Sequence, residues 1–403
     1  MSSELIGHGA RTVARTEAGE VTPEKPDMHL LTLLAFGHMV VDINGGAIPA
    51  LLPFLKSALS LSYTSSGVII LMSNIMSSLI QPVFGYFSDK TARRWMLPTA
   101  VALSTIGIGL TGVMPSYMAV LIMVTVSGLG IAAYHPEGYR TATEIAGSRK
   151  ATGISIFSTG GNIGIAVGPP LITVLVTAFG LSGSLGMWIP GFIATAFLAV
   201  SLRKFSPNTV SHPHSNASTA AKTSVWGMTI LILVVAIRSW TQSGFTTFVP
   251  FYYIEVMRGD PRMVGTLLAI FLGSGAAGTL IAGPIADRIG VRRYAVGVFL
   301  AAAPLAVGYL FVGGIFGYVI LGALGFVLMS TFTMTVALGQ AYMPRNLGMA
   351  SGLIVGFATG AGGLGVTVLG WVADHWGLIT ALWISALMPL LAFAVSLLLP
   401  EPE

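Results

Sequence analysis

Hydrophobic residues are arranged along the chain in long stretches that short polar segments separate. Each stretch contains about 20 residues or more, which is the length that an α-helix needs to cross the hydrocarbon core of a bilayer. The pattern therefore predicts an all-α membrane protein with twelve transmembrane helices. Their expected ranges are 29–55, 62–86, 95–114, 117–141, 151–178, 184–202, 225–254, 263–285, 294–313, 315–341, 348–372 and 379–399.

The composition supports this membrane assignment. Mean hydropathy is +0.82, and only 9% of the 403 residues are charged, whereas about 25% are charged in a typical soluble domain. The polar segment 1–28 has no signal-peptide pattern and is expected to be a disordered cytoplasmic tail. We expect a six-helix bundle over 29–203, a polar cytoplasmic linker over 204–223 and a second six-helix bundle over 224–400.

Two short polar segments share one pattern, in which a Gly stands four residues before an Asp and basic residues follow. The members are Gly85, Asp89, Arg93 and Arg94 in the first copy and Gly283, Asp287, Arg288 and Arg292 in the second. The copies lie 198 residues apart, about half of the chain. The repeat predicts two pseudo-symmetric halves related by an axis along the membrane normal. We expect the two aspartates to gate the cytoplasmic side rather than to bind substrate.

The repeated segments resemble the signature of the major facilitator superfamily, which comprises twelve-helix secondary transporters. The first copy departs from that signature at Lys90 and Ala92, where Arg and Gly are usual. Further segments are similar to the fosmidomycin resistance protein family, namely 37–42, 81–86, 135–137 with the sequence His-Pro-Glu, 160–162, 168–169 and 370–375. This resemblance implies proton-driven efflux of a small compound such as a phosphonate antibiotic.

The distribution of basic residues predicts the orientation. With the N-terminus inside, fifteen Lys and Arg residues fall on the cytoplasmic side and three fall outside. Because cytoplasmic loops carry an excess of Lys and Arg, both termini are expected in the cytoplasm. The same rule explains the net charge of +5, so no nucleic-acid partner is expected. The absence of cysteine fits a bacterial inner membrane, where we expect a monomer.

Ionisable residues inside two expected helices are the candidates for proton coupling. Asp42 lies about 20 Å into the first helix at about 1.5 Å per residue, and His135 and Glu137 lie near the end of the fourth. Charge at that depth is costly and therefore marks function by default. We favour Asp42 as the proton carrier, because its depth places it near the membrane midplane. The alternative is a carboxylate that a neighbouring helix caps structurally.

The fourth helix also predicts an ion pair between Glu137 and Arg140, three residues apart. In a transporter this pair would open as the helices move, whereas the alternative is a static brace of the helix end. Glu144, further along, is expected to be solvated in a loop.

A substrate cavity is expected between the two halves. Its candidate residues are His38, Asn44, Arg140, Arg238, Trp240 and Gln242. Arg238 must pair with an acid, a carbonyl or an anionic ligand, because it does not lose its proton. With Arg140 it would favour an anionic or zwitterionic substrate. The alternatives are that Arg238 extends toward the headgroups and that Trp240 faces lipid or only packs.

Small residues in the fifth expected helix predict close helix packing. Gly164 and Gly168 have GxxxG spacing and Pro169 follows, a combination that lets a neighbouring backbone approach and bends the helix.

Together these features predict a proton-coupled exporter of a small compound that works by rocking of its halves. An uptake symporter would use the same fold and the same carboxylates, and a channel or a membrane-embedded hydrolase is a more remote alternative. Gly-x-Ser-x-Gly, His-Glu-x-x-His and Walker motifs are absent, so we expect neither an enzyme nor a cofactor. His212 and His214 stand in the polar linker and are not expected to bind a metal.

Overall fold

A computed structural model describes residues 26–90, 93–147, 149–205, 223–344 and 347–401. Most of the expected tail and most of the expected linker lie outside the described residues. Within them the chain is helical and contains no strand. Eleven helices of this part are long and apolar enough to cross a membrane, and the shorter apolar helix Met96–Thr111 completes the expected twelve.

The helices follow the order that hydropathy predicts. The first half contains α1 (Met28–Leu59), α2 (Tyr63–Asn74), the π-helix η1 (Ile75–Leu79), α3 (Gln81–Lys90), α4 (Met96–Thr111), α5 (Tyr117–Ile145), α6 (Lys150–Phe179), η2 (Leu181–Met187), α7 (Trp188–Ser201) and η3 (Leu202–Lys204). The second half contains α8 (Val225–Phe251), η4 (Tyr252–Val256), η5 (Pro261–Met263), α9 (Val264–Ile289), α10 (Val291–Tyr309), α11 (Gly314–Tyr342), α12 (Leu347–Trp376) and α13 (Leu378–Ser396). The elements α2, η1 and α3 together make one irregular membrane span.

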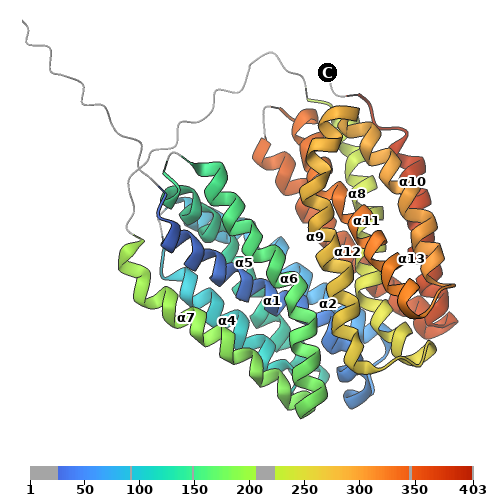
Figure 1. Ribbon diagram of the computed structural model, residues 1–403, viewed down its shortest axis with the longest axis horizontal. Helices are drawn as coiled ribbons and strands as arrows, with labels where there is room; N and C mark the ends of the chain where they lie inside the picture. Colours follow the sequence, from blue (N-terminus) through green and yellow to red (C-terminus); the bar gives the residue numbers. More distant parts are fainter. Residues whose placement is uncertain (1–25, 91–92, 148, 206–222, 345–346, 402–403) are drawn as a thin grey trace, which may run out of the picture.

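The two halves form separate bundles that diverge toward one end of the molecule (Figure 1). We call the end where α7 finishes and α8 begins the linker end, and the opposite end the far end. At the far end, one hydrophobic cluster joins both halves and includes Leu51 of α1, Phe248 of α8 and Val366 of α12. Toward the linker end, the core instead divides into separate clusters, each of which lies within one half. The halves are therefore closed together at the far end and separated at the linker end.

Glycine allows α6 to pack directly on α1. A Cβ atom on Gly164 would lie 2.2 Å from the carbonyl oxygen of Met39, and one on Gly168 would lie 2.4 Å from that of Ile43. These separations are shorter than any side chain tolerates, so glycine is required where the two backbones touch. Pro169, the next residue, lies between the halves, where its carbonyl oxygen is 2.7 Å from a Cβ placed on Gly265 of α9.

Candidate functional site

A cavity of about 340 Å³ lies between the halves beside the middle of α1. The first half lines it from α1, α2, η1, α3, α5 and α6, and the second half lines it from α8 and α9. Its polar lining consists of Asp42, Ser73, Asn74, Ser77, Ser78, Gln81, His135, Gln242, Ser243, Thr246 and Thr247. This volume is in the range of small-molecule sites, and the many hydroxyl and amide groups can orient a polar ligand.

Asp42 lies between two histidines at the wall of this cavity. Its Oδ2 atom is 3.3 Å from Nε2 of His38, and its Oδ1 atom is 3.4 Å from Nε2 of His135. His38 and Asp42 come from α1, whereas His135 comes from α5. Asp42 and His135 line the cavity, but His38 does not and is only 3% exposed. We call these three residues the His-Asp-His cluster.

Backbone groups hold both rings of the cluster in position. Nδ1 of His38 lies 2.8 Å from the carbonyl oxygen of Phe157, and Nδ1 of His135 lies 2.8 Å from that of Ile131. The ring of Phe157 also stacks on His38 with centroids 4.0 Å apart. A Cβ atom on Gly161 would lie 2.6 Å from Asp42 Oδ2 and 2.7 Å from His38 Nε2, so the α6 backbone covers the cluster without a side chain.

Arg238 is a buried cation in the second half. The residue is 3% exposed, and its Nε and Nη1 atoms are buried without a hydrogen-bond partner among the residues that the structure describes. The centre of the Phe332 ring lies 5.8 Å from Cζ of Arg238. Gln242, which lines the cavity, is one helical turn away on the same face of α8. An unpaired buried cation is costly, so this position favours an anionic partner from outside the described chain.

Polar contacts join the two halves at the far end. Nζ of Lys56 lies 3.3 Å from Oε1 of Glu255 and 4.3 Å from the ring centre of Tyr63, whose hydroxyl donates to Glu255. Lys56 and Tyr63 belong to the first half, and Glu255 belongs to the second. These contacts close the far end of the cavity region with charged and aromatic groups.

Asp374 of α12 caps α2 from the opposite half. Its carboxylate accepts hydrogen bonds from the backbone N–H of Tyr63 at 2.8 Å and of Thr64 at 2.9 Å, and from Oγ1 of Thr64 at 2.5 Å. The first N–H groups of a helix lack partners within the helix, and an acidic cap satisfies them. A cap that comes from the other half is made only while the far end is closed.

Comparison with known families agrees with this architecture. The Major Facilitator Superfamily model matches residues 34–363. The chain belongs to the Major Facilitator Superfamily. The transporter is 33% identical to the MFS-type transporter YfnC of Bacillus subtilis (strain 168) over 95% of this chain and 96% of the relative. It is 30% identical to the fosmidomycin resistance protein of Escherichia coli (strain K12) over 95% of this chain and 96% of that protein.

The fold is also that of solved transporters. A bacterial homologue of the human lysosomal transporter Spinster, in an inward-facing and occupied conformation, superposes with a TM-score of 0.76 at 15% identity, covering 92% of this chain and 96% of that chain. The protein is thus a multi-pass integral membrane transporter of the superfamily and not an enzyme.

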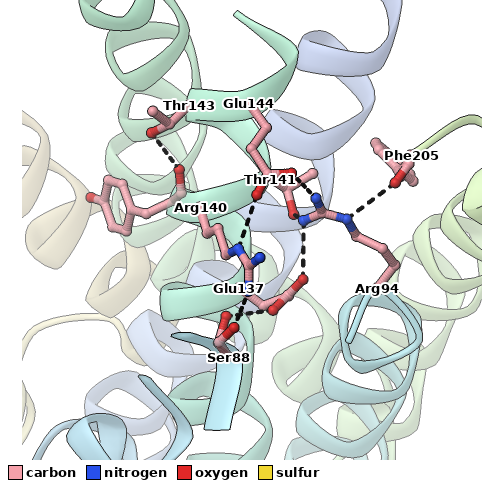
Figure 2. A network of polar contacts seen from close by, with 9 residues as sticks. Ser88, Arg94, Glu137, Arg140, Thr141, Thr143, Glu144 and Phe205 are labelled. Atoms are coloured by element: carbon pink, nitrogen blue, oxygen red, sulfur yellow. Dashed lines mark hydrogen bonds and ion pairs between the residues drawn. The ribbon is translucent and has the colours of Figure 1, made fainter. Parts of the chain in front are cut away.

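The signature loop of this transporter takes part in a buried ion network at the linker end (Figure 2). Arg94 pairs with Glu137 at 3.0 Å, donates to Glu144 and Thr141, and donates through Nε to the carbonyl oxygen of Phe205 at 3.1 Å. Glu137 is fully buried. The network ties the loop before α4 to α5 and to the end of α7.

Two expectations about this network are wrong. Glu137 pairs with Arg94 and accepts a 2.5 Å hydrogen bond from Ser88 Oγ, rather than pairing with Arg140. Arg140 pairs with Glu144 at 2.9 Å and donates to the carbonyl oxygen of Ser88, so Glu144 is not a solvated loop residue. The reason is tertiary: Arg94 comes from the preceding loop and neutralises both acids, which spacing along α5 does not reveal.

The other signature residues lie apart from the cavity. Arg93 stands 5.5 Å from the ring of Phe87. Arg292 pairs with Glu401 at 2.9 Å within the second half. Gly85 lies beside Pro136, whereas Gly283 has open space around it and Arg288 is exposed. The side chains of Asp89 and Asp287 lie outside the described residues.

Of the six expected cavity residues, Gln242 alone is among the residues that line this cavity. Asp42 and His135, which were expected for proton coupling, line it as well. Asn44 instead donates to Ser104 and Thr105 of α4 at 3.0 and 3.1 Å, and Trp240 packs against Gly365 of α12. Sequence reasoning missed the polar groups of the irregular second span, namely Ser73, Asn74, Ser77, Ser78 and Gln81. The cluster of serines within an apolar span was the available signal.

Proposed function

We propose that this transporter couples proton movement to the efflux of a small anionic or zwitterionic compound by alternating access. The observation that carries the proposal is the His-Asp-His cluster at the wall of the cavity between the halves. Asp42 and His135 are ionisable groups in contact with that cavity. Transporters of this type bind substrate and coupling ion near the midplane, where each can be exposed to either side in turn.

The orientation in this proposal follows from the positive-inside rule, which predicts that the linker end and both termini face the cytoplasm of a bacterial cell. The separation of the halves at that end then suits entry of a compound from the cytoplasm. The cavity is built by the two halves of one chain, which supports function as a monomer.

The substrate class is inferred from the charges that lack partners. Arg94 and Arg140 are neutralised by Glu137 and Glu144, whereas Arg238 has no partner among the described residues. A carboxylate or phosphonate group would supply the missing negative charge. The similarity to a fosmidomycin resistance protein is consistent with a phosphonate-like compound.

Efflux can be tested in proteoliposomes with radiolabelled fosmidomycin as the probe. We expect saturable transport that is driven by a pH gradient and collapses when the gradient is dissipated. Arg238→Gln should weaken equilibrium binding of the probe by about tenfold or more, as expected for loss of a charge-assisted hydrogen bond, while Arg258→Gln, an exposed position at the far end, should not. Good transport of cationic dyes together with no response to phosphonates or carboxylates would overturn the substrate assignment.

An uptake symporter remains the second candidate, since it would use the same cavity and carboxylate. The direction of proton movement distinguishes the two. Proton flux opposite to the flux of the compound supports efflux by exchange, and flux in the same direction supports uptake.

Gating by the signature aspartates is part of the proposal. Asp89→Asn should slow transport while leaving equilibrium binding of the compound within a few-fold, because a gate residue affects the conformational step. The assay compares initial transport rates with equilibrium binding in the same preparation. A large loss of binding would show that Asp89 acts at the substrate site instead.

A further inference from the structure

We propose that the His-Asp-His cluster binds two protons, one on Nε2 of His38 and one on Nε2 of His135, while Asp42 remains the ionised bridge between them. This inference rests on the proposed function, because it specifies how the same transporter would carry protons. It assigns a proton-binding role to His38, which does not touch the cavity.

The hydrogen bonds of the two Nδ1 atoms determine where the additional protons bind. A backbone carbonyl only accepts hydrogen bonds, so the Nδ1 atoms of His38 and His135 must each carry a hydrogen toward Phe157 and Ile131. In a neutral imidazole the other nitrogen then has a lone pair and no hydrogen. Both Nε2 atoms therefore receive a hydrogen only when the ring takes up a proton and becomes cationic.

The contacts with Asp42 favour uptake at both rings. Nε2 of His38 and Nε2 of His135 approach different oxygens of the same carboxylate, at 3.3 and 3.4 Å. With no added proton, two lone pairs would face a carboxylate, and all the groups in contact would be acceptors. One proton satisfies one of these contacts, whether it resides on the ring or on the carboxylate. Two protons convert both contacts into attractive ion pairs.

The charge of the cluster therefore changes from −1 with no added proton to 0 with one and +1 with two. The described side chains around it do not offset this change. The nearest other titratable groups are Tyr134 and Tyr139 of α5, whose ring centres are each 6.1 Å from that of His38. The hydroxyl of Tyr134 donates to Leu34, and that of Tyr139 lies 3.3 Å from Ser158.

Apart from Arg238 of α8, which stands one helical turn from the cavity residue Gln242, the remaining elements around the cluster add no unpaired charge among the described residues. From α6 the neighbours are Phe157 and the backbone at Gly161. From α5, Glu137 is bound to Arg94 and Ser88. The parts of α2, η1, α3 and α8 that line the cavity supply only amides, hydroxyls and apolar groups. The cluster is thus the titrating unit, and its net charge must be balanced by the substrate or by proton exchange.

The two rings differ in access. His135 and Asp42 line the cavity, whereas His38 is covered by Phe157 and by the α6 backbone at Gly161. Because the Asp42 carboxylate contacts both rings, it provides a route by which a proton from the cavity can reach His38. His135 is accordingly the outer proton site and His38 the inner one.

Solid-state ¹⁵N NMR of the full chain, labelled at the imidazole nitrogens of its seven histidines and reconstituted in lipid, tests the proposal without a substrate. His38→Gln and His135→Gln assign the two signals. We expect both rings to be doubly protonated at low pH and to lose the Nε2 hydrogen, not the Nδ1 hydrogen, as pH rises. In Asp42→Asn, the pH-dependent signals of both rings should differ from those of the wild type, because the negative charge that favours the cationic rings is gone.

His375 is the matched internal control. Its Nδ1 atom lies 2.9 Å from the carbonyl oxygen of Trp371, four residues earlier, as Nδ1 of His135 does with Ile131. His375 forms no ion pair with a carboxylate among the described residues, so its NMR signal should not respond to Asp42→Asn. If His38 stays neutral throughout, the cluster holds one proton and the proposal fails. It also fails if both rings stay neutral and metal analysis finds a tightly bound divalent cation.

Transport stoichiometry supplies a second measurement. With the membrane potential held at zero, one pH unit supports about a tenfold gradient per proton carried. Radiolabelled fosmidomycin should reach about a 100-fold gradient in the wild type and about a tenfold gradient in His38→Gln. Titration of both rings without proton-coupled transport would contradict the proposed function alone. Coupled transport with equal gradients in both proteins would contradict the two-proton inference alone.

Discussion

Removal of the Asp374 carboxylate should shift the conformational equilibrium of the transporter. Asp374 accepts three hydrogen bonds from Tyr63 and Thr64 across the far-end junction. These bonds exist only while the far end is closed and the linker end is separated. Asp374→Ala therefore destabilises the conformation described here relative to one in which the far end is open.

The size of the shift follows from the capping geometry. Loss of a helix cap typically costs about 1 kcal/mol. This value applies here because Asp374 is exposed, so water can replace its carboxylate at the freed N–H groups. A change of about 1 kcal/mol alters a population ratio about fivefold. The far-end-open population should thus increase about fivefold. Asp374→Asn, which keeps one neutral acceptor oxygen, should give a smaller increase.

Spin-label distance measurements provide the assay, and the absence of cysteine from the chain makes labelling straightforward. Cysteines at Ser182 and Ile315, exposed far-end positions in the first and second halves, report far-end opening. Asp260→Asn is the matched control, because Asp260 caps η5 within its own half by accepting from Arg262 N–H at 2.9 Å. An unchanged distance distribution in Asp374→Ala would refute the role of this cap in closure.

Three further substitutions test the interior. Gly161→Ala should reduce transport at least tenfold, because the new Cβ atom would lie 2.6 Å from Asp42 Oδ2. Gly352→Ala is the control and should be neutral, because nothing lies within 4 Å of its Cβ position. Equal transport by the two variants would contradict this reasoning. Arg94→Ala should lower the free energy of unfolding by about 3 kcal/mol, since it leaves the buried carboxylate of Glu137 unpaired, and thermal unfolding should show partial recovery when Glu137→Gln is added. Asp42→Asn should abolish gradient-driven transport but retain exchange at equal pH. Full gradient-driven transport in this variant, together with its loss in Glu137→Gln, would assign proton coupling to Glu137 instead.

The helices could be predicted because bilayer thickness sets the length of the apolar stretches. The two halves could be predicted because the Gly and Asp signature occurs twice, about half of the chain apart. The irregular second span could not be predicted, since hydropathy is insensitive to helix type. A continuous helix was expected over 62–86, but α2 gives way to η1 before Pro82. Proline lacks the N–H that would satisfy a carbonyl one turn earlier, and a π-helical turn accommodates such a mismatch. The serines of this segment consequently face the cavity.

Individual residues of the site could be predicted from the sequence, but the contacts between residues on different helices could not. The depth of Asp42 marks it from sequence alone, because charge is costly in a membrane, and His38 follows from spacing along one helix. His135 could not be assigned to Asp42, since the contact depends on how α5 packs against α1. Arg94 illustrates the same limit, because a loop residue was not expected to neutralise an acid buried in α5 of the same half.

The packing of α5 suggests how proton binding and the linker-end network communicate. His135 and Glu137 stand on either side of Pro136, and at about 100° per residue their side chains leave the helix on nearly opposite faces. His135 contacts Asp42 of α1, and Glu137 contacts Arg94 and Ser88. Pro136 has no N–H to donate to the carbonyl oxygen of Ala132 one turn earlier, which makes this turn the easiest part of α5 to bend. A change of charge in the His-Asp-His cluster that moves His135 would therefore also displace the carboxylate that holds the signature loop, so a single helix would connect protonation to gating.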